Sequence, residues 1–293
     1  MSKQPPQPVL NLPRGRLLSL NEPVIMGILN VTPDSFSDGG AHAHPQRAIE
    51  FAMQMIRQGA TIIDIGGEST RPGAQRIDAA QQIKRTVPVI QKLRASNEQV
   101  VISIDTTLSE VAQAALDAGA DIINDVSAGE DDPRNFELAA GRNVPLILMH
   151  KQGLPATMQD RPVYDNVVCQ VHEYLLQRAE IAVQAGGAKE QIVLDPGIGF
   201  GKTVTHNMAL IGAMDRLVAT GYAVLLGASR KRSLGAVCTM PNEPSPESAT
   251  LVGATCSTTT LGVMSGVHIF RVHDVQANWQ ALQVSLNVRR CCK

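Results

Sequence analysis

The chain has 293 residues, a formal net charge of -1, 44% hydrophobic residues and 18% charged residues. This balance is typical of a folded globular protein, and the near-neutral charge argues against a general electrostatic grip on nucleic acid or an anionic membrane. The first thirty residues do not have the pattern of a secretory leader, and no apolar run reaches about 18 residues, so we expect a cytoplasmic protein. The five cysteines lack metal-ligand or CxxC spacing, so we expect reduced thiols.

Residues 1–20 form a proline-containing N-terminal arm, which we expect to be either a cap or a disordered tail, and residues 21–290 are assigned to one domain. Eight short β-rich apolar runs follow in chain order: 24–30, 61–67, 100–106, 121–126, 145–150, 192–197, 223–229 and 268–274. Apolar residues at helical spacing lie between most of these runs. Eight strand–helix units predict an α/β fold, a single closed (β/α)8 TIM barrel. An open Rossmann-like sheet is the alternative, but no composition break marks its two usual halves.

Polar or reactive side chains stand at the C-terminal end of almost every apolar run. They include Asn30, Glu68, Asp105, Asn124, Met149, His150, Asp195 and residues 229–231 and 271–273. The C-terminal ends of parallel barrel strands open on one face, where the βα loops build the active site, so we expect these groups to converge. Any single one could be a capped turn or a satisfied polar group, but a purely structural protein has no need of the whole ring.

The glycine-rich segment 195–203 resembles a nucleotide-binding loop but fails both templates. A Walker loop would need glycine in place of Pro196, and a dinucleotide fingerprint starting at Gly197 would need glycine in place of Lys202. We therefore predict a flexible turn that leaves Asp195 pointing into the barrel and Phe200 at its rim.

Two further features of the sequence suit the binding of an oxyanion such as phosphate. Arg271 and His273 alternate by two on a strand and share one face, where the guanidinium fork can grip phosphate and the imidazole can add a donor. A structural ion pair with Asp274 is the alternative. Segment 66–73 adds hydroxyls, backbone amides and Arg71 in a glycine-rich loop.

The carboxylates of Asp105 and Asp195 and the amide of Asn124 suit a ring that carries several N–H donors. A 2-amino-4-oxo pyrimidine edge is such a ring, because one carboxylate can accept both its amino and its ring N–H hydrogens. A hydrolytic acid/base pair is the alternative, and separation along the sequence does not choose between them.

At these residues the chain resembles the dihydropteroate synthase family of pterin-binding enzymes. Segments 26–40 and 65–74 are similar to the two signatures of that family, and shorter matches fall at 103–105, 123–125, 148–150, 194–202, 227–231 and 271–274. The resemblance implies a barrel that condenses 6-hydroxymethyl-7,8-dihydropterin pyrophosphate with p-aminobenzoate to give 7,8-dihydropteroate. It also implies that pyrophosphate leaves before the arylamine attacks.

The resemblance assigns residues to each part of the site. The pterin pocket would consist of Asp105, Asn124, Met149, Asp195 and Lys231. The pyrophosphate site would consist of Asn30, Thr70, Arg71, Arg271 and His273, with Asn30 also a ligand of Mg²⁺, the one cofactor implied. The p-aminobenzoate site would consist of Phe36, Ser37, Pro72, Phe200, Lys231 and Arg232. Catalytic roles fall to Asp38, Arg71, Lys231, Arg271 and His273.

The first loop, residues 32–40, is polar and turn-forming, and we predict that it orders only over bound substrate. Asp38 would then offer negative charge to a pterin cation, and Phe36 would exclude water. Lys151 and Ser233 depart from the residues common in the family at their positions, which puts local packing or inhibitor response in doubt more than the reaction.

Two other functions remain open. A pterin-dependent methyltransferase would share the barrel and the pterin pocket but should lack the phosphate arginines, and a non-catalytic pterin-binding paralogue should have lost catalytic positions. The expected partners are small-molecule substrates, with no nucleic acid and no membrane. Segment 251–264 carries small residues on most of its helical faces, and the family is usually dimeric, so we predict a homodimer.

Overall fold

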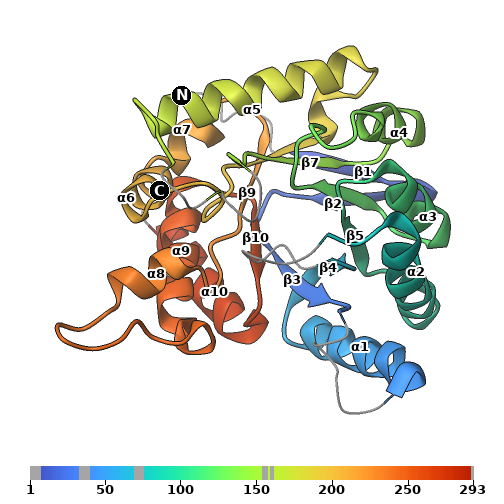
Figure 1. Cartoon of the computed structure of the whole chain (residues 1–293), viewed down its shortest axis with the longest axis horizontal. Helices are drawn as coiled ribbons and strands as arrows, with labels where there is room; N and C mark the ends of the chain where they lie inside the picture. The colour runs from blue at the N-terminus through green and yellow to red at the C-terminus, as the bar shows by residue number, and fades with distance from the viewer. Residues whose placement is uncertain (1–7, 33–39, 69–75, 154–157, 159–161, 292–293) are drawn as a thin grey trace.

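The structure is a computed structural model that describes residues 8–32, 40–68, 76–153, 158 and 162–291, with residues 40–44 described by their backbone alone. Within this part of the chain, eight parallel strands form a closed barrel (Figure 1). The strands are β3 (Val24–Asn30), β4 (Ala60–Gly66), β5 (Val101–Asp105), β6 (Ile122–Asp125), β7 (Leu146–Met149), β8 (Ile192–Asp195), β9 (Ala223–Leu226) and β10 (Ile269–Val272). The last strand pairs with β3 and closes the sheet, which confirms the predicted TIM barrel and excludes the open Rossmann-like alternative.

Helices follow the strands along the chain and pack around the barrel (Figure 1). They are α1 (Gly40–Arg57), α2 (Ala79–Ser96), α3 (Ser109–Ala118), α4 (Arg134–Arg142), α5 (Val167–Gln184), α6 (Val204–Gly212), α7 (Met214–Val218), α8 (Arg232–Val237), α9 (Val252–Ser265) and α10 (Val275–Cys291). Local sequence sets several of their ends. Asp78 caps α2 by accepting a hydrogen bond from the Gln81 amide, and Gly266 ends α9 in the left-handed conformation. None of the helices in the described part of the chain combines the length and hydropathy that a membrane crossing requires.

The barrel strands bury both of their faces. On β3, for example, Ile25 belongs to the large apolar cluster between strands and helices, whereas its neighbour Met26 belongs to a second cluster inside the barrel. This alternation follows from the two-residue repeat of a strand. It explains why the runs are aliphatic almost throughout and why their few polar residues are conspicuous.

A hairpin precedes the barrel and was not foreseen from the sequence. Its strands β1 (Val9–Leu12) and β2 (Arg16–Ser19) pair antiparallel around the short 3-10 turn η1 (Pro13–Gly15). Four of its side chains join the cluster inside the barrel: Leu10, Leu12, Leu18 and Leu20. Because that cluster also contains the first residues of several barrel strands, the hairpin closes the N-terminal end of the barrel.

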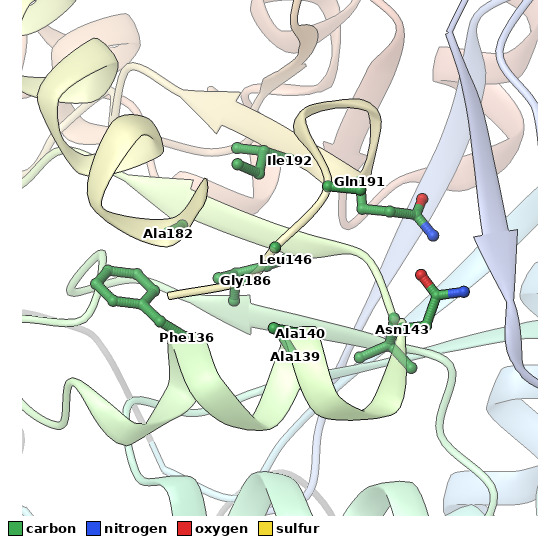
Figure 2. Close-up of a pocket in the computed structure, with 12 residues that line it drawn as sticks. Phe136, Ala139, Ala140, Asn143, Leu146, Ala182, Gly186, Gln191 and Ile192 are labelled. Atoms are coloured by element: carbon green, nitrogen blue, oxygen red, sulfur yellow. The ribbon is translucent and has the colours of Figure 1, made fainter. Parts of the chain in front are cut away.

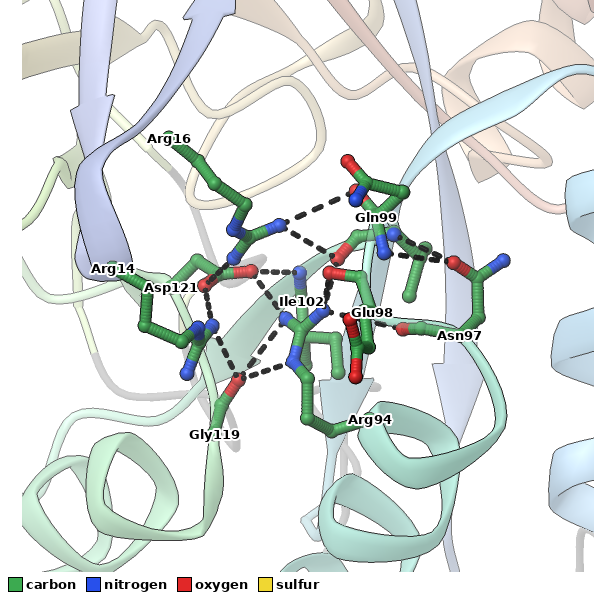
Figure 3. Close-up of polar contacts among 10 residues, drawn as sticks. Arg14, Arg16, Arg94, Asn97, Glu98, Gln99, Ile102, Gly119 and Asp121 are labelled. Atoms are coloured by element: carbon green, nitrogen blue, oxygen red, sulfur yellow. Dashed lines mark hydrogen bonds and ion pairs between the residues drawn. The ribbon is translucent and has the colours of Figure 1, made fainter.

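One buried carboxylate ties the hairpin to the barrel wall. Asp121, which immediately precedes β6, accepts hydrogen bonds from three arginines and a backbone amide (Figure 3). Arg14 and Arg16 come from the hairpin, and Arg94 comes from α2. The Ile102 amide donates to the same carboxylate at 2.9 Å. This network lies at the N-terminal end of the barrel, opposite the face where barrels of this fold carry their active sites, so we assign it to stability and not to catalysis.

Candidate active site

The polar residues at the C-terminal strand ends meet around one arginine. Arg271, on β10, donates from Nε to Asp64 Oδ2 at 2.6 Å and from Nη2 to Asp105 Oδ2 at 2.6 Å. Asn124 donates from Nδ2 to the same Oδ2 of Asp64 at 3.1 Å. These contacts join β4, β5, β6 and β10 across the mouth of the barrel, as the sequence analysis expected for three of the four residues.

The fourth residue, Asp64, was missed. It stands two residues before the end of β4 in an otherwise apolar run and is fully buried. The sequence analysis considered only groups at the ends of the runs. The sequence did carry a signal for Asp64. It lies two residues after Ile62 on the same strand, so its side chain points to the same face, and the side chain of Ile62 lies inside the barrel.

Burial sets the protonation of these groups. Burial raises the pKa of Asp105 to about 7, with Arg271 opposing the shift and Asp64 adding to it. Burial also raises the pKa of Asp195. Burial would lower the pKa of Arg271, but the carboxylates of Asp64 and Asp105 more than offset this and raise it. The site therefore contains a permanent cation, Arg271, close to two carboxyl groups, Asp105 and Asp195, that hold protons more readily than usual.

The pterin residues nominated from the sequence end neighbouring strands. Asp105, Asn124, Met149 and Asp195 lie on β5, β6, β7 and β8, and all four are buried. Met149 is aligned with Asp195 in the β7–β8 register. Asp195 accepts a hydrogen bond from the Gly197 amide at 2.7 Å. The arrangement can present two carboxylates, one amide and a flat thioether wall to a planar ring.

Lys231 stands next to this cluster. It immediately precedes α8, and its Nζ lies 4.0 Å from the centre of the Phe200 ring, in cation–π contact. Burial lowers the pKa of Lys231 to about 8, and the positive charge of Arg271 adds to the shift. The structure thus brings together two residues nominated for the p-aminobenzoate site. The third described residue of that group, Arg232, is exposed at the start of α8.

His273 is held as a neutral imidazole. Its Nδ1 lies 3.0 Å from Ser229 Oγ, and its backbone amide donates to the same oxygen at 3.1 Å. Burial, with the charges of Arg230 and Arg271, lowers the pKa of His273 to about 3. Asp274 pairs with Arg230 through both oxygens and not with Arg271, so the ion pair weighed for Arg271 and Asp274 is wrong.

Asn30 offers an oxygen at the same mouth. Its Oδ1 lies 3.5 Å from the position that a Cβ on Gly66 would take, and Asp105 Oδ2 lies 3.8 Å from that position. An amide oxygen is a ligand that Mg²⁺ accepts. Among the described residues no group of three or more histidine, cysteine or carboxylate side chains is arranged to hold a metal.

Six nominated residues lie outside the described part of the chain: Phe36, Ser37, Asp38, Thr70, Arg71 and Pro72.

The structure describes both residues that depart from the family pattern, Lys151 and Ser233. Lys151 donates from Nζ to Asp131 Oδ1 at 2.9 Å, and Arg76 pairs with the same carboxylate. Ser233 is buried in α8.

A pocket of about 400 Å³, including its open mouth, lies away from these residues (Figure 2). Residues of α4 and of the segment between α5 and β8 line it, among them Phe136, Asn143, Gly186 and Gln191. Gln191 exchanges two hydrogen bonds with the main chain of Asn11 in the hairpin, at 2.9 and 3.0 Å. The lining carries no ionisable side chain, and its link to the hairpin places it toward the N-terminal end of the barrel. We therefore do not consider it the reactive site.

Comparisons with known proteins agree with this geometry. The sequence profile of the family described as pterin binding enzyme matches residues 26–273. A protein of Streptococcus pyogenes serotype M6 named dihydropteroate synthase is 46% identical over 270 residues, which cover 92% of this chain and 97% of that protein.

Solved structures give the same result. Dihydropteroate synthase of Xanthomonas albilineans with 4-aminobenzoic acid superposes with a TM-score of 0.88 at 40% identity, covering 97% of this chain and 99% of that one. The Xanthomonas albilineans enzyme in complex with 7,8-dihydropteroate superposes with a TM-score of 0.84 at 38% identity, covering 96% and 99%.

Proposed function

The chain belongs to the pterin-binding enzyme family, and we propose from its site that it condenses 6-hydroxymethyl-7,8-dihydropterin pyrophosphate with p-aminobenzoate to give 7,8-dihydropteroate and pyrophosphate. This is the dihydropteroate synthase reaction, a transfer of the pterin methylene group to an arylamine. The observation that carries the proposal is the position of Arg271, held between Asp64 and Asp105 beside the buried Asp195. No feature of the described residues favours the methyltransferase or the non-catalytic alternative.

The buried carboxylates select the pterin. When ionised, Asp195 can accept the amino and ring N–H hydrogens of a pterin edge, and Asn124 can both donate and accept. Asp195 already accepts one hydrogen bond from the Gly197 amide, and a ligand without N–H donors would leave its remaining acceptor capacity unused, at a cost of ~1–3 kcal/mol for each unsatisfied buried group. The pocket therefore binds by polar complementarity and rejects hydrocarbon rings.

The same residues then favour loss of pyrophosphate. Breaking the carbon–oxygen bond leaves positive charge on the pterin methylene group and places the electron pair on the departing phosphate oxygen. Arg271 remains charged and can stabilise that oxygen, and His273, being neutral, can donate one hydrogen bond without adding charge repulsion. The amino group of p-aminobenzoate then attacks the cation and releases a proton to solvent, and Lys231 beside Phe200 holds the benzoate.

Mg²⁺ completes the pyrophosphate site in this proposal. When bound, it would neutralise the phosphate oxygens as charge builds on the leaving group. Asn30 is the residue that would hold it, because its amide oxygen lies at the strand ends of the site, 3.5 Å from the position that a Cβ on Gly66 would take. Turnover should stop in excess chelator and return when Mg²⁺ is restored. Full turnover after confirmed metal removal would refute this requirement.

In this proposal the first loop supplies one further catalytic group, Asp38. Asp38 would offer negative charge to the cation and Phe36 would exclude water, a proposal that rests on their sequence context alone. We expect Asp38→Ala to lower kcat by roughly 100-fold or more, the scale of losing one preorganised electrostatic group, with little change in affinity for the pterin substrate. Normal turnover by this variant, or failure only through lost pterin binding, would refute the role.

Assembly and location follow the same proposal. We infer a homodimer from apolar side chains that stay exposed on two adjacent helices: Leu261 and Met264 on α9, and Val284 and Val288 on α10. The free thiols of Cys169, Cys238, Cys256 and Cys291 suit a reducing compartment, so we place the enzyme in the cytoplasm.

The decisive experiment measures pyrophosphate release by the purified enzyme with each substrate alone and with both together. Release that needs the pterin pyrophosphate and yields dihydropteroate only with p-aminobenzoate is the expected result. No release with both substrates and Mg²⁺ present would overturn the proposed function.

A further inference from the structure

A buried lysine in the loop that follows β8 has no role in the reaction described above. Lys202 is 2% exposed, and its Nζ donates to the backbone oxygens of Gly197 at 3.0 Å and Phe200 at 2.9 Å. It also contacts His150, at 2.9 Å to Nδ1 and 3.3 Å to the backbone oxygen. The ammonium is thus enclosed by three carbonyls and one imidazole, all of them neutral acceptors.

This enclosure joins two loops. His150 follows β7, whereas Gly197 and Phe200 belong to the loop that follows β8. The loops approach closely: a Cβ on Gly197 would stand 1.9 Å from the His150 carbonyl oxygen, and one on Gly201 would stand 2.2 Å from the Gln152 carbonyl oxygen. Both glycines have positive φ, of 66° and 63°, so other residues are excluded by conformation as well as by space.

The converging carbonyl oxygens need hydrogen-bond donors between them, and Lys202 Nζ supplies these donors. A buried ammonium without a carboxylate partner is unfavourable, and burial accordingly lowers the pKa of Lys202 to about 7. His150 can accept, because burial and the charge of Lys202 lower its pKa to about 3. The hydrogen bonds of this buried group hold the loop after β8 in a fixed position against the loop after β7.

That loop carries Phe200, whose ring contacts Lys231 Nζ at 4.0 Å. The contact of Lys202 with the Phe200 carbonyl therefore fixes the backbone from which this ring extends. We propose that Lys202 is a positioning residue for p-aminobenzoate, acting through Phe200 without touching either substrate. The inference rests on the proposed function, because it presumes that p-aminobenzoate binds between Phe200 and Lys231.

Kinetics with Lys202→Met tests the role. Methionine keeps an unbranched side chain, one atom shorter than that of lysine, and lacks the ammonium, so Phe200 loses its anchor. We expect the KM for p-aminobenzoate to rise at least ~10-fold, since misplacement by about 1 Å can cost ~100-fold, while the KM for the pterin pyrophosphate changes less than ~3-fold. Tyr164→Phe is the matched control, because its hydroxyl donates to the Gly201 carbonyl of the same loop at 2.9 Å, and both of its KM values should stay unchanged.

Variants of His150 keep the test decisive if Lys202→Met does not fold. His150→Asn places an acceptor near the position of Nδ1, whereas His150→Leu removes it. We expect His150→Leu alone to raise the KM for p-aminobenzoate. Equal KM values in the two His150 variants, or equal rises for both substrates in Lys202→Met, would overturn the positioning role. Wild-type turnover measured alongside distinguishes this failure from failure of the proposed function.

Discussion

Arg271 is the central residue of the described part of the site. Two of its nitrogens already bond to Asp64 and Asp105, and a guanidinium has five N–H donors in all. It can therefore bind phosphate oxygens while the carboxylates hold its plane in place. A preorganised donor of this kind loses little side-chain entropy when the ligand arrives.

Replacing this arginine should weaken pyrophosphate binding. We expect Arg271→Ala to lower the binding free energy by ~1.5–3 kcal/mol, the usual contribution of a hydrogen bond to a charged group. Calorimetric titration with pyrophosphate and Mg²⁺ measures it. Arg230→Ala is the control, because Arg230 pairs with Asp274 and should leave the affinity unchanged. Equal affinities for Arg271→Ala and the wild type would refute the assignment.

Asp105 should make stability depend on pH. Its pKa is about 7 in the folded chain and 3.8 ordinarily, so the folded state binds a proton more readily than the unfolded state. The resulting stabilisation is fully present below pH 3.8 and is lost as the pH rises to about 7. Asp105→Asn lacks this titration. Urea unfolding across that range should show the wild type losing stability relative to the variant, whereas parallel curves would mean an ordinary pKa.

Sequence reasoning reached the described site residues but not their partners. Asp105, Asn124 and Asp195 were found because polar groups end apolar runs, which is a local signal. Asp64 was not found, because its role depends on Arg271 reaching it across the barrel from a strand 207 positions along the chain. The spacing of two from Ile62 indicates that Asp64 points into the barrel, but its pairing with Arg271 is set by the closure of the barrel.

At the scale of elements, the hairpin is the feature that the sequence analysis left undecided. Its leucines alternate by two on either side of a Pro-Arg-Gly turn, which is a readable hairpin signal. The prolines of residues 1–20 instead indicated a capping arm or a disordered tail. The positions of the eight barrel strands were predicted well, because strands buried on both faces give continuous aliphatic runs.

The hairpin should contribute to stability and not to turnover. Leu10 is fully buried in the barrel interior, so we expect Leu10→Ala to lower the free energy of unfolding by ~2–5 kcal/mol, the range for core leucines. Leu17, on the same hairpin, is 66% exposed, and Leu17→Ala should change it by less than about 0.5 kcal/mol. Urea denaturation gives both values. Similar losses in the two variants would contradict a packed hairpin.

At the scale of the whole molecule, α9 and α10 explain the small residues noted in the sequence. Gly262 faces the ring of Phe270, which a Cβ would approach to 2.5 Å. Thr255, Thr258 and Thr259 are buried within the chain. Much of the small-residue pattern therefore serves internal packing, and the argument for association rests on the exposed apolar residues that remain.

Association should depend on this surface. Val284 is 67% exposed on α10, and a lysine there would bury a charge in a dimer interface. We expect the wild type to have twice the chain mass of 31.3 kDa in light scattering at micromolar concentration, and Val284→Lys to shift toward that of a single chain. Val163→Lys, at a site 73% exposed outside α9 and α10, should stay dimeric. A wild-type monomer would reject the dimer.

The pairing of β10 with β3 has a consequence for synthesis on the ribosome. The start of β10 lies 239 positions after the end of β3. At a synthesis rate of ~5–20 residues per second, β10 is made ~12–50 s after β3. During that interval the open edge of β3 can pair with other chains. The inner cluster that receives the hairpin is likewise incomplete until Ile269 has emerged. The nascent chain therefore exposes an unpaired strand edge and an incomplete inner core until its last barrel strand has been made.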